Sequence, residues 1–558
     1  MAIDLPPALP PQLVTLQEIQ SYSSGAPYVG NVNGYQLNIS GQHYLSNDEL
    51  DRVMAAAKTT SQAIILMNAQ VALKGHYLVS MVYVPDGKVV YVHAVQKRVS
   101  RVEGEGIAGY FDSIVGDVDL TRSEFDRARV MANVKSERVG VNYTSSFRVD
   151  NDGEGVTLVL NPQPVEDHDA TDLILQLGNQ GSRYVGRYFG DIALNHNFSG
   201  GAKGSIGYET AFTEWGESRG GEDYHRIQIG LDKPFASGLY GVTASHVEYA
   251  QNLGSNAGDA GSQGLCQVLG ALGLCTPAAS ASASVDLEAD INVVGLSGEQ
   301  VLASDLDYRF NLFERLDYVD SQIDVDGFDP IQDEKYATLE LGVKYFAAHA
   351  ISNQRLLRWS AQLSVKGGVT GDDGTLGTYD DFIAANPAAA LSAQISPAAR
   401  TAEFITLKPK LSLKLPVSDA GSFNINVLAQ YSDEQVPQQQ QWVLGGMSSI
   451  SAYLPGVLAG DSGYFGIANY EHQIDFSGVK ITGSIFTEYG AAWYENVSGA
   501  AGDERSIADA GVRVSADFGW GLTLDAVAAR NIADDGFDVN DEIERLETDF
   551  YVVLKKVF

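Results

Sequence analysis

The chain has 558 residues and a formal net charge of −34, from 37 basic and 71 acidic residues. This acidity argues against a nucleic-acid partner, because neutralising phosphates requires clustered lysine and arginine. No apolar run reaches the length of about 18 residues that a membrane helix needs. A membrane β-barrel is not excluded, since alternating residues dilute its hydropathy signal. The opening stretch MAIDLPPALPPQ lacks the basic and apolar regions of a signal peptide, so export would imply a chain that has lost its signal.

The N-terminal part is expected to contain a tail and one small α+β unit. Residues 1–31 carry prolines, serines and glycines and are expected to form a tail or linker; within it LVTLQEIQSY could make a short helix. Residues 32–100 begin with the strand GYQLNISG. A helix follows behind the capping box formed by Ser46 and Glu49. A second helical stretch and two strands joined by an Asp-Gly hairpin signal complete the unit.

A second unit of similar layout covers residues 101–168. It has a strand near RVEGEG, a helix behind a second capping box at Thr121 and Glu124, and two closing strands, VGVNYTSSFRV and GVTLVLNPQPV. Each unit has the size and element order of a small independent α+β domain.

From residue 170 to residue 558 the pattern changes to amphipathic segments of about ten residues, the length of tilted membrane strands. We count sixteen of them, and closed bacterial barrels have an even number of strands. The connections alternate between short turns, such as DKPFASG, and long acidic loops, such as ADDGFDVNDEIERLE. The predicted fold is therefore mainly β, a sixteen-stranded antiparallel transmembrane barrel behind two small α+β domains. A soluble β-sandwich, the rival fold, does not explain the alternation of loop lengths.

The segment FITLKPKLSLKL shows which face of a strand would be wet. With a period of two, Lys408, Lys410 and Lys414 share one face and leucines the other, so we expect the lysines in the lumen and the leucines against lipid. Glu340 is expected in the lumen by the same argument. The lysines could guide a cargo electrostatically or balance lumenal carboxylates such as Glu340 and Glu488, and we favour the second interpretation.

Several motifs in this order resemble one family. LQLGNQGSRYVGRYFGDIALNHN is similar to its barrel opening, and GHYLVSMVYVP to a segment of its first polypeptide-transport-associated (POTRA) domain. LGGMSSISAYLPG resembles its inward-folded sixth loop, and IFTEYGAAW resembles the Phe-x-Asp-x-Gly strand that this loop contacts. The family is the TpsB-type outer-membrane transporters of two-partner secretion, also called the haemolysin and adhesin secretion and activation family, which belongs to the POTRA plus β-barrel superfamily. The resemblance spans residues 32–558 and implies two POTRA domains, at 32–100 and 101–168, before a barrel at 170–558.

The resemblance also implies a site. The loop-contacting strand would supply Phe486, Glu488 and Gly490, and the sixth-loop tip would comprise Gly445, Gly446, Ile450, Ser451, Ala452 and Tyr453. The family's tip carries an arginine that pairs with the acid of the strand, and Ser451 stands in its place here. A carboxylate without a partner is costly when desolvated. Either a lumenal lysine such as Lys408 or Lys410 pairs with Glu488, or the lumen is wet enough for Glu488 to stand alone.

The function implied by the resemblance is export. POTRA domains in the periplasm would capture an unfolded exoprotein that carries an N-terminal secretion domain, and the barrel in the Gram-negative outer membrane would pass it to the surface. Partners would be this exoprotein and outer-membrane lipid or lipopolysaccharide, with the chain acting as a monomer. Two alternatives stay open: an assembly factor that inserts barrels, and a channel or adhesin that works through its acidic loops. With about thirty residues before the first unit, we expect no stable helical plug.

Enzymatic chemistry is not indicated. The nine histidines form no metal-spaced cluster in the sequence, and no nucleotide-binding or serine-hydrolase motif occurs. We expect no catalytic residue, no metal and no cofactor. DVDGFDP resembles a calcium loop but lacks its ligand spacing, and a solvated loop is the better interpretation. Cys266 and Cys275 lie close together in the sequence and would form a disulfide in an oxidising compartment, the alternative being two buried thiols.

Overall fold

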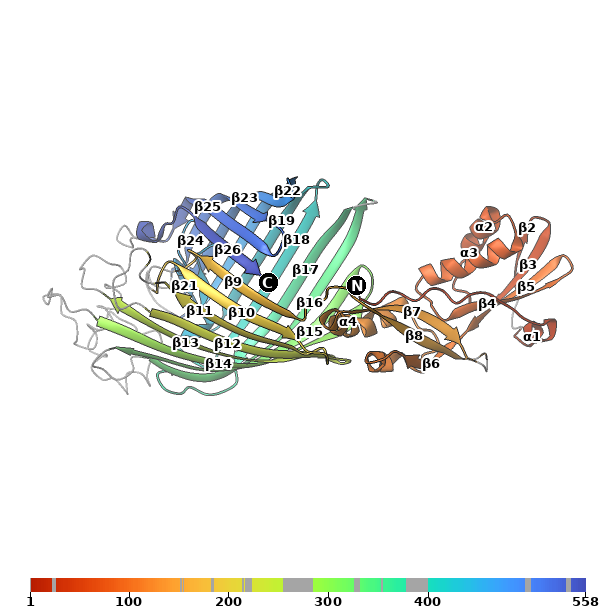
Figure 1. The fold of residues 1–558 in the computed structure, drawn as a ribbon, viewed down its shortest axis with the longest axis horizontal. Coiled ribbons are helices and arrows are strands. Elements are labelled where there is room, and N and C mark those ends of the chain that lie inside the picture. Colours follow the sequence, from red (N-terminus) through yellow and green to blue (C-terminus); the bar gives the residue numbers. More distant parts are fainter. Residues whose placement is uncertain are drawn as a thin grey trace.

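The structure is a computed structural model, and Figure 1 shows a large barrel with two small units extending from one end in a line. It describes residues 2–22, 27–150, 153, 155–181, 185–212, 215, 223–253, 285–325, 332–352, 355–377, 400–496, 503–537 and 543–558. None of the helices in these ranges combines the length and apolarity needed to span a bilayer.

The first unit is a five-stranded sheet with helices on it. Its elements are β1 (Gln12–Leu13), α1 (Leu16–Ser21), β2 (Tyr28–Val32), β3 (Tyr35–Gly41), α2 (Asn47–Ala56), α3 (Thr60–Leu73), β4 (Val79–Asp86) and β5 (Val89–Gln96), in the sheet order β1-β4-β5-β3-β2. The expected capping box is present at the start of α2, where Ser46 and Glu49 exchange hydrogen bonds. Hydrogen bonds to Glu49 from Lys74 and from the Ser46 N–H lower the pKa of this carboxyl to about 2. On α3 the buried Ile64, Met67 and Val71 recur at helical spacing and form part of the core.

The second unit is a three-stranded sheet covered by one long helix. It contains β6 (Arg98–Glu103), the short 3-10 helix η1 (Ala108–Ile114), α4 (Arg122–Val139), β7 (Val141–Val149) and β8 (Gly155–Pro164), in the order β6-β8-β7. Thr121 and Glu124 form the second capping box, and Gly140 ends α4 with a φ of 66°, a left-handed conformation that glycine adopts at no steric cost.

The N-terminal tail is built into both units. Ile3 bridges β7 in parallel, and its side chain is fully buried in the core of the second unit together with that of Leu9. The carbonyl of Ile3 accepts from the Arg129 guanidinium, and that of Leu9 accepts from the Asn68 side chain. Further on, β1 pairs in parallel with β4 of the first unit, and α1 packs against β4 and β5. Residues 2–13 therefore cover one sheet edge in each unit, and the expected short helix lies on the first unit.

The barrel confirms the predicted fold class. Sixteen antiparallel strands close through the pairing of the first with the last. Their bounds are β9 (Thr171–Gly178), β10 (Phe189–Asn197), β11 (Lys203–Ala211), β12 (Asp223–Phe235), β13 (Gly238–Leu253), β14 (Val285–Ser304), β15 (Tyr308–Val325), β16 (Gln332–Ser352), β17 (Arg355–Gly368), β18 (Ile405–Pro416), β19 (Gly421–Ser432), β22 (Ser462–Phe476), β23 (Val479–Trp493), β24 (Arg505–Asp517), β25 (Leu522–Asp535) and β26 (Tyr551–Val557). The 3-10 helix η4 (Ile543–Leu546) precedes the last strand.

The two faces of the barrel strands alternate as membrane strands require. On β18 the side chains of Leu407, Leu411 and Leu415 are exposed on the outer surface. Lys410 and Lys414, on the opposite face, line a cavity inside the barrel. Apolar side chains therefore form the outer belt and polar side chains line the lumen, which is the arrangement of a barrel surrounded by lipid.

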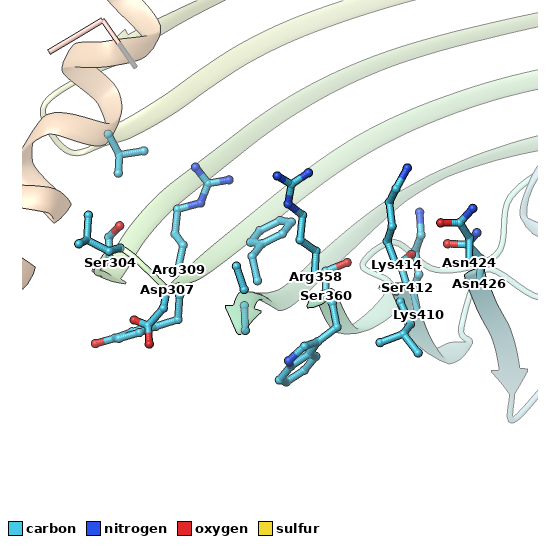
Figure 2. Close-up of a pocket in the computed structure, with 18 of the residues that line it drawn as sticks. Ser304, Asp307, Arg309, Arg358, Ser360, Lys410, Ser412, Lys414, Asn424 and Asn426 are labelled. Atoms are coloured by element: carbon cyan, nitrogen blue, oxygen red, sulfur yellow. The ribbon is translucent and has the colours of Figure 1, made fainter. Parts of the chain in front are cut away.

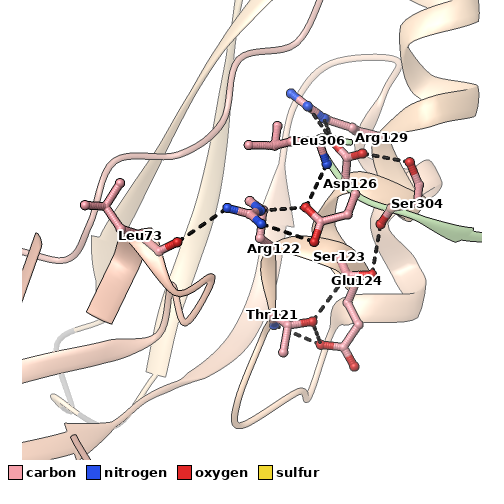
Figure 3. A network of polar contacts seen from close by, with 10 residues as sticks. Leu73, Thr121, Arg122, Ser123, Glu124, Asp126, Arg129, Ser304 and Leu306 are labelled. Atoms are coloured by element: carbon pink, nitrogen blue, oxygen red, sulfur yellow. Dashed lines mark hydrogen bonds and ion pairs between the residues drawn. The ribbon is translucent and has the colours of Figure 1, made fainter. Parts of the chain in front are cut away.

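Helix α4 fastens the second unit to the barrel mouth. Arg122 forms a two-pronged ion pair with Asp305 in the turn between β14 and β15, with N–O distances of 2.6 and 3.2 Å. Ser123 donates to the Ser304 carbonyl, and the Ser304 hydroxyl donates to Asp126 (Figure 3). Burial acts to raise the pKa of Asp305, but its hydrogen bonds with Arg122 and the Leu306 N–H outweigh this, so the pKa lies below its usual range.

At its other end, α4 is tied to the neighbouring turns. Arg138 pairs with Asp232 on β12 and donates to the Gly201 carbonyl, 3.1 Å away. The 3-10 helix η1, which packs against α4, adds a further contact, because the hydroxyl of its Tyr110 donates to the Pro234 carbonyl at 2.6 Å. The helix is thus held along one side of the mouth, next to the opening of the lumen.

Candidate functional site: the loop docked inside the barrel

The segment between β19 and β22 folds back into the lumen. It contains the 3-10 helix η3 (Gln438–Gln440) and a small hairpin of β20 (Trp442–Leu444) and β21 (Leu458–Gly460). Near its base the Gln440 side chain donates to the Tyr336 hydroxyl, and the Gln438 N–H donates to Glu334 at 3.0 Å, both on β16. The loop therefore starts against the β16 wall and carries its tip toward the opposite wall.

The tip binds that wall through two consecutive backbone N–H groups. The Ser451 N–H donates to Oε2 of Glu488 on β23 at 2.7 Å, and the Ala452 N–H donates to Oδ2 of Asp509 on β24 at 2.8 Å. All four residues are buried. These two adjacent N–H groups, called the backbone nest below, each bind one of two neighbouring carboxyl groups, so the loop meets the acids of the wall without using a cationic side chain.

A strained residue creates this nest. Ile450 has a φ of 51°, in the left-handed region that β-branched residues avoid at a cost of roughly 1–3 kcal/mol. Its side chain is fully buried. The conformation turns the next two N–H groups to the wall, and burial of the aliphatic side chain offsets the strain. Gly445 and Gly446, with φ values of 116° and 93°, make the turn that leads into the tip.

Two carboxyl groups lie against each other under the tip. Glu488 and Asp509 are 1 % and 0 % exposed and are direct register partners on β23 and β24. Within the described part of the chain, Glu488 Oε1 and Asp509 Oδ1 have no hydrogen-bond partner. Arg513 interacts electrostatically with Glu488, but its guanidinium lies over the Phe486 ring and donates to the Met447 carbonyl at 3.0 Å.

Close packing against the strand completes the docking. The side chains of Leu444, Ile450 and Phe486 belong to one buried cluster between the loop and the wall. A Cβ atom added at Gly490 would lie 2.6 Å from Leu444 Cδ1 and 3.1 Å from Ile450 Cδ1. The wall needs a glycine here because the loop side chains occupy the space of a side chain.

The far side of the tip is held by residues that the sequence did not point to. The Tyr453 side chain is fully buried, and its carbonyl accepts from the Tyr551 hydroxyl on β26. The Leu454 N–H donates to the carbonyl of Leu546, and the Thr548 N–H donates to that of Ala452. The tip thus lies between the strands β23 and β24 and the segment before β26.

Both expectations about Glu488 are wrong. Lys408 and Lys410 are not its partners, because Lys408 interacts with Glu340 and Asp317 and Lys410 lines the cavity at the mouth. A wet lumen does not solvate Glu488 either, since the group is buried under the tip. The physical reason is that backbone N–H groups, which every residue except proline supplies, bind the acid in this chain.

The other charged residues predicted from the sequence to lie in the lumen, Lys408, Lys414 and Glu340, pair with groups other than Glu488. Lys408 shares a polar cavity of about 350 Å³ with Lys366, whose Nζ lies 3.7 Å from Asp317. Lys414 pairs with Glu471 on β22, and Glu340 accepts a hydrogen bond from Ser364 at 2.6 Å. Lys414 and Lys408 therefore balance carboxylates, but neither balances Glu488.

One group of potential metal ligands was not visible as a motif. His246 and Glu248 on β13 and Asp290 on β14 come together on the outer face. They contact one another and Asn292, which hydrogen-bonds to His246 at 2.8 Å, and these contacts account for their positions. Cross-strand pairing brings them together, so sequence spacing alone could not reveal them. Cys266, Cys275 and most of the DVDGFDP segment lie outside the described residues.

Comparison with known proteins agrees with this architecture. The family model described as "Haemolysin secretion/activation protein ShlB/FhaC/HecB" matches residues 279–512, somewhat less than half of the chain. CdiB from Escherichia coli is similar in structure, with 14 % identity, a TM-score of 0.67, and coverage of 96 % of this chain and 92 % of that one. CdiB from Acinetobacter baumannii has 13 % identity, a TM-score of 0.59, and coverage of 97 % and 96 %. Among curated protein sequences none matches the chain.

The class that fold and site define is an outer-membrane barrel with two small units at its mouth and a loop docked inside. The similarity to the CdiB structures establishes the fold, and the family match covers the barrel from β14 to β24 and includes the docked loop. The resemblance to the outer-membrane transporters of two-partner secretion is therefore confirmed.

Proposed function

We propose that this chain exports an unfolded exoprotein through its barrel to the cell surface. The observation that carries the proposal is the junction at the mouth, where the second unit is fixed by α4 beside the opening of a barrel whose family match is to secretion proteins. The two units would be POTRA domains in the periplasm, and the apolar outer belt would sit in outer-membrane lipid. The chain would act as a monomer, because one chain closes the barrel by itself. No catalytic step is part of the proposal.

Capture of the cargo would use the sheet edges of the two units. An extended segment can add to an exposed edge by strand addition, with main-chain hydrogen bonds giving affinity. Here residues 2–13 already cover the edges of β4 and β7. Binding at these edges therefore requires release of the tail. The outer edge of β6 is also partly occupied, because Val99 exchanges backbone hydrogen bonds with Gly116 and Asp117.

The docked loop would act as the lid of the pore. It crosses the lumen from β16 to β23 and β24, so a chain in transit requires the tip to leave its nest or to be bypassed. Folding of the cargo outside would supply the direction of transport, since no nucleotide-binding motif occurs in the sequence.

The test compares the secreted and outer-membrane proteins of the source cell with and without this chain. Loss of one large exoprotein, with other barrels intact, is the expected result. A broad fall in outer-membrane barrels would instead identify an assembly factor, and no change in either would favour a channel or adhesin.

The role of the tail can be tested in the same cells. Leu13 and Tyr83 are register partners on β1 and β4, and cysteines at both positions would lock the tail onto the edge when oxidised. We expect export to fall in the oxidised double variant and to recover on reduction, with the two single-cysteine variants as controls. Equal export from the locked and unlocked forms would show that capture does not use this edge.

A further inference from the structure

A large cavity lies where the lumen meets the second unit. Its volume is about 1090 Å³, and it is bounded on one side by α4 and on the other by β15 to β19 and β22. Any chain that passes from the second unit into the barrel beside α4 has to cross this space. The side chains of the cavity wall are therefore the first barrel groups that such a chain would contact.

The barrel side of the cavity carries a row of cations, beside the acidic residues Asp305, Asp307 and Glu471. Arg309 on β15, Arg358 on β17, and Lys410 and Lys414 on β18 all line it. In Figure 2 the side chains of Arg309, Arg358 and Lys414 rise from the wall in the same direction. In a chain with a net charge of −34, composition does not predict a basic surface at this place.

The row is only partly neutralised. Lys414 pairs with Glu471, and Arg309 lies over the Phe346 ring at 4.9 Å, with its Nε unpaired. Arg358 and Lys410 make no side-chain hydrogen bond or ion pair with the described residues, although both border the cavity. Their charges are thus available to a molecule inside it.

The row also places two like charges side by side, which lowers the stability of the sheet and therefore calls for a reason other than folding. Arg358 and Lys414 are direct register partners on adjacent strands and face the same side. Like charges directly opposite each other destabilise a sheet. Asn424 on β19 continues the row as the register partner of Lys414, so the polar donors extend across neighbouring strands.

We propose that this basic row is a binding surface for acidic segments of the chain in transit. Carboxylates of an extended segment would meet Arg358 and Lys410 as they leave α4, which presents Glu137 to the same cavity and so disfavours the segment's return. This proposal rests on the proposed export function and adds the chemistry of the cargo at the mouth.

The test uses the full-length protein in detergent and a labelled oligoglutamate as the probe, with oligolysine of equal length for comparison. We expect oligoglutamate to bind and oligolysine not to bind, and we expect binding to weaken as salt is raised. The double variant Arg358→Gln, Lys410→Gln should lower the affinity about tenfold or more. The matched control is Arg355→Gln, on the same strand but paired with Asp419 in the turn between β18 and β19 and not part of the cavity lining, and it should leave the affinity unchanged.

A photo-crosslinking residue at Ser360, which lines the cavity between the cations, locates the probe. Crosslinking of oligoglutamate there, lost in the double variant, supports the proposal even if a variant is less stable. Equal binding of both peptides, unchanged affinity in the double variant, or no crosslink at Ser360 would overturn it. Because no cargo is used, binding without export in cells would refute the export function alone, and export without binding would refute only this inference.

Discussion

Removing the acceptor of the loop tip should open the lid. In Glu488→Ala the Ser451 N–H stays buried without an acceptor, which costs about 2 kcal/mol for a group of this kind. At about 1.4 kcal/mol per factor of ten, the fraction of molecules with a released tip should rise about thirtyfold. Of the two hydrogen bonds of the nest, the one between Ala452 and Asp509 would then remain.

The substitution Glu488→Gln should act in the opposite way. The amide oxygen still accepts from Ser451, and the amide nitrogen can donate to Asp509 Oδ1, which has no hydrogen-bond partner among the described residues. Replacing one of two adjacent carboxyls by a neutral amide also removes any like-charge repulsion between them. We expect the tip to stay docked at least as firmly as in the unmodified protein.

Pulsed electron paramagnetic resonance between nitroxides at Ser448 on the loop and Ser360 on the wall measures the tip position, because both residues border the cavity at the mouth. We expect the population with a docked tip to be highest in Glu488→Gln, lower in the unmodified protein and lowest in Glu488→Ala. If Ala and Gln give the same distance distribution, the two N–H contacts do not hold the tip, and the reasoning is refuted.

Three further predictions concern the tail, the junction and the wall. Ile3→Ala should lower the stability of the second unit by about 2–5 kcal/mol, since the side chain is fully buried there, and Ile3→Val by less; thermal unfolding of the full chain measures both. The ion pair with Arg122 lowers the pKa of Asp305, so the contribution of Asp305 to docking is full above its unfolded pKa of about 3.9 and is lost as the pH falls through the lower folded pKa. Crosslinking between the second unit and the barrel should therefore decline on acidification. In Asp305→Asn the crosslinking should be weak and should not change with pH over this range. Gly490→Ala should displace the loop at a cost of about 1–3 kcal/mol. The control Gly483→Ala, on the same strand, should leave the loop in place, because an added Cβ there meets nothing within 4 Å. If electron paramagnetic resonance distances show the docked tip position in both variants, the prediction is contradicted.

The patterns in the chain were sufficient for the architecture. Alternation of lysine and leucine around Lys410 predicted which face of β18 is wet, because the side-chain period of a strand is two whatever surrounds it. The capping boxes at Ser46 and Thr121 predicted where two helices begin, because their hydrogen bonds are local. The sixteen amphipathic segments predicted a barrel, since an even number of such strands can close.

Contacts between segments distant in the sequence were decided only by the tertiary structure. Nothing near Asp509 in the sequence places it beside Glu488; the register of β23 with β24 does, through a direct pairing of the two residues. The burial of Ile3 in the second unit depends on an edge that exists only after folding. The missing arginine at Ser451 was visible in the sequence, but its replacement was not, because a backbone N–H carries no residue signature and becomes an anion ligand only when the strained turn at Ile450 aims it at the wall.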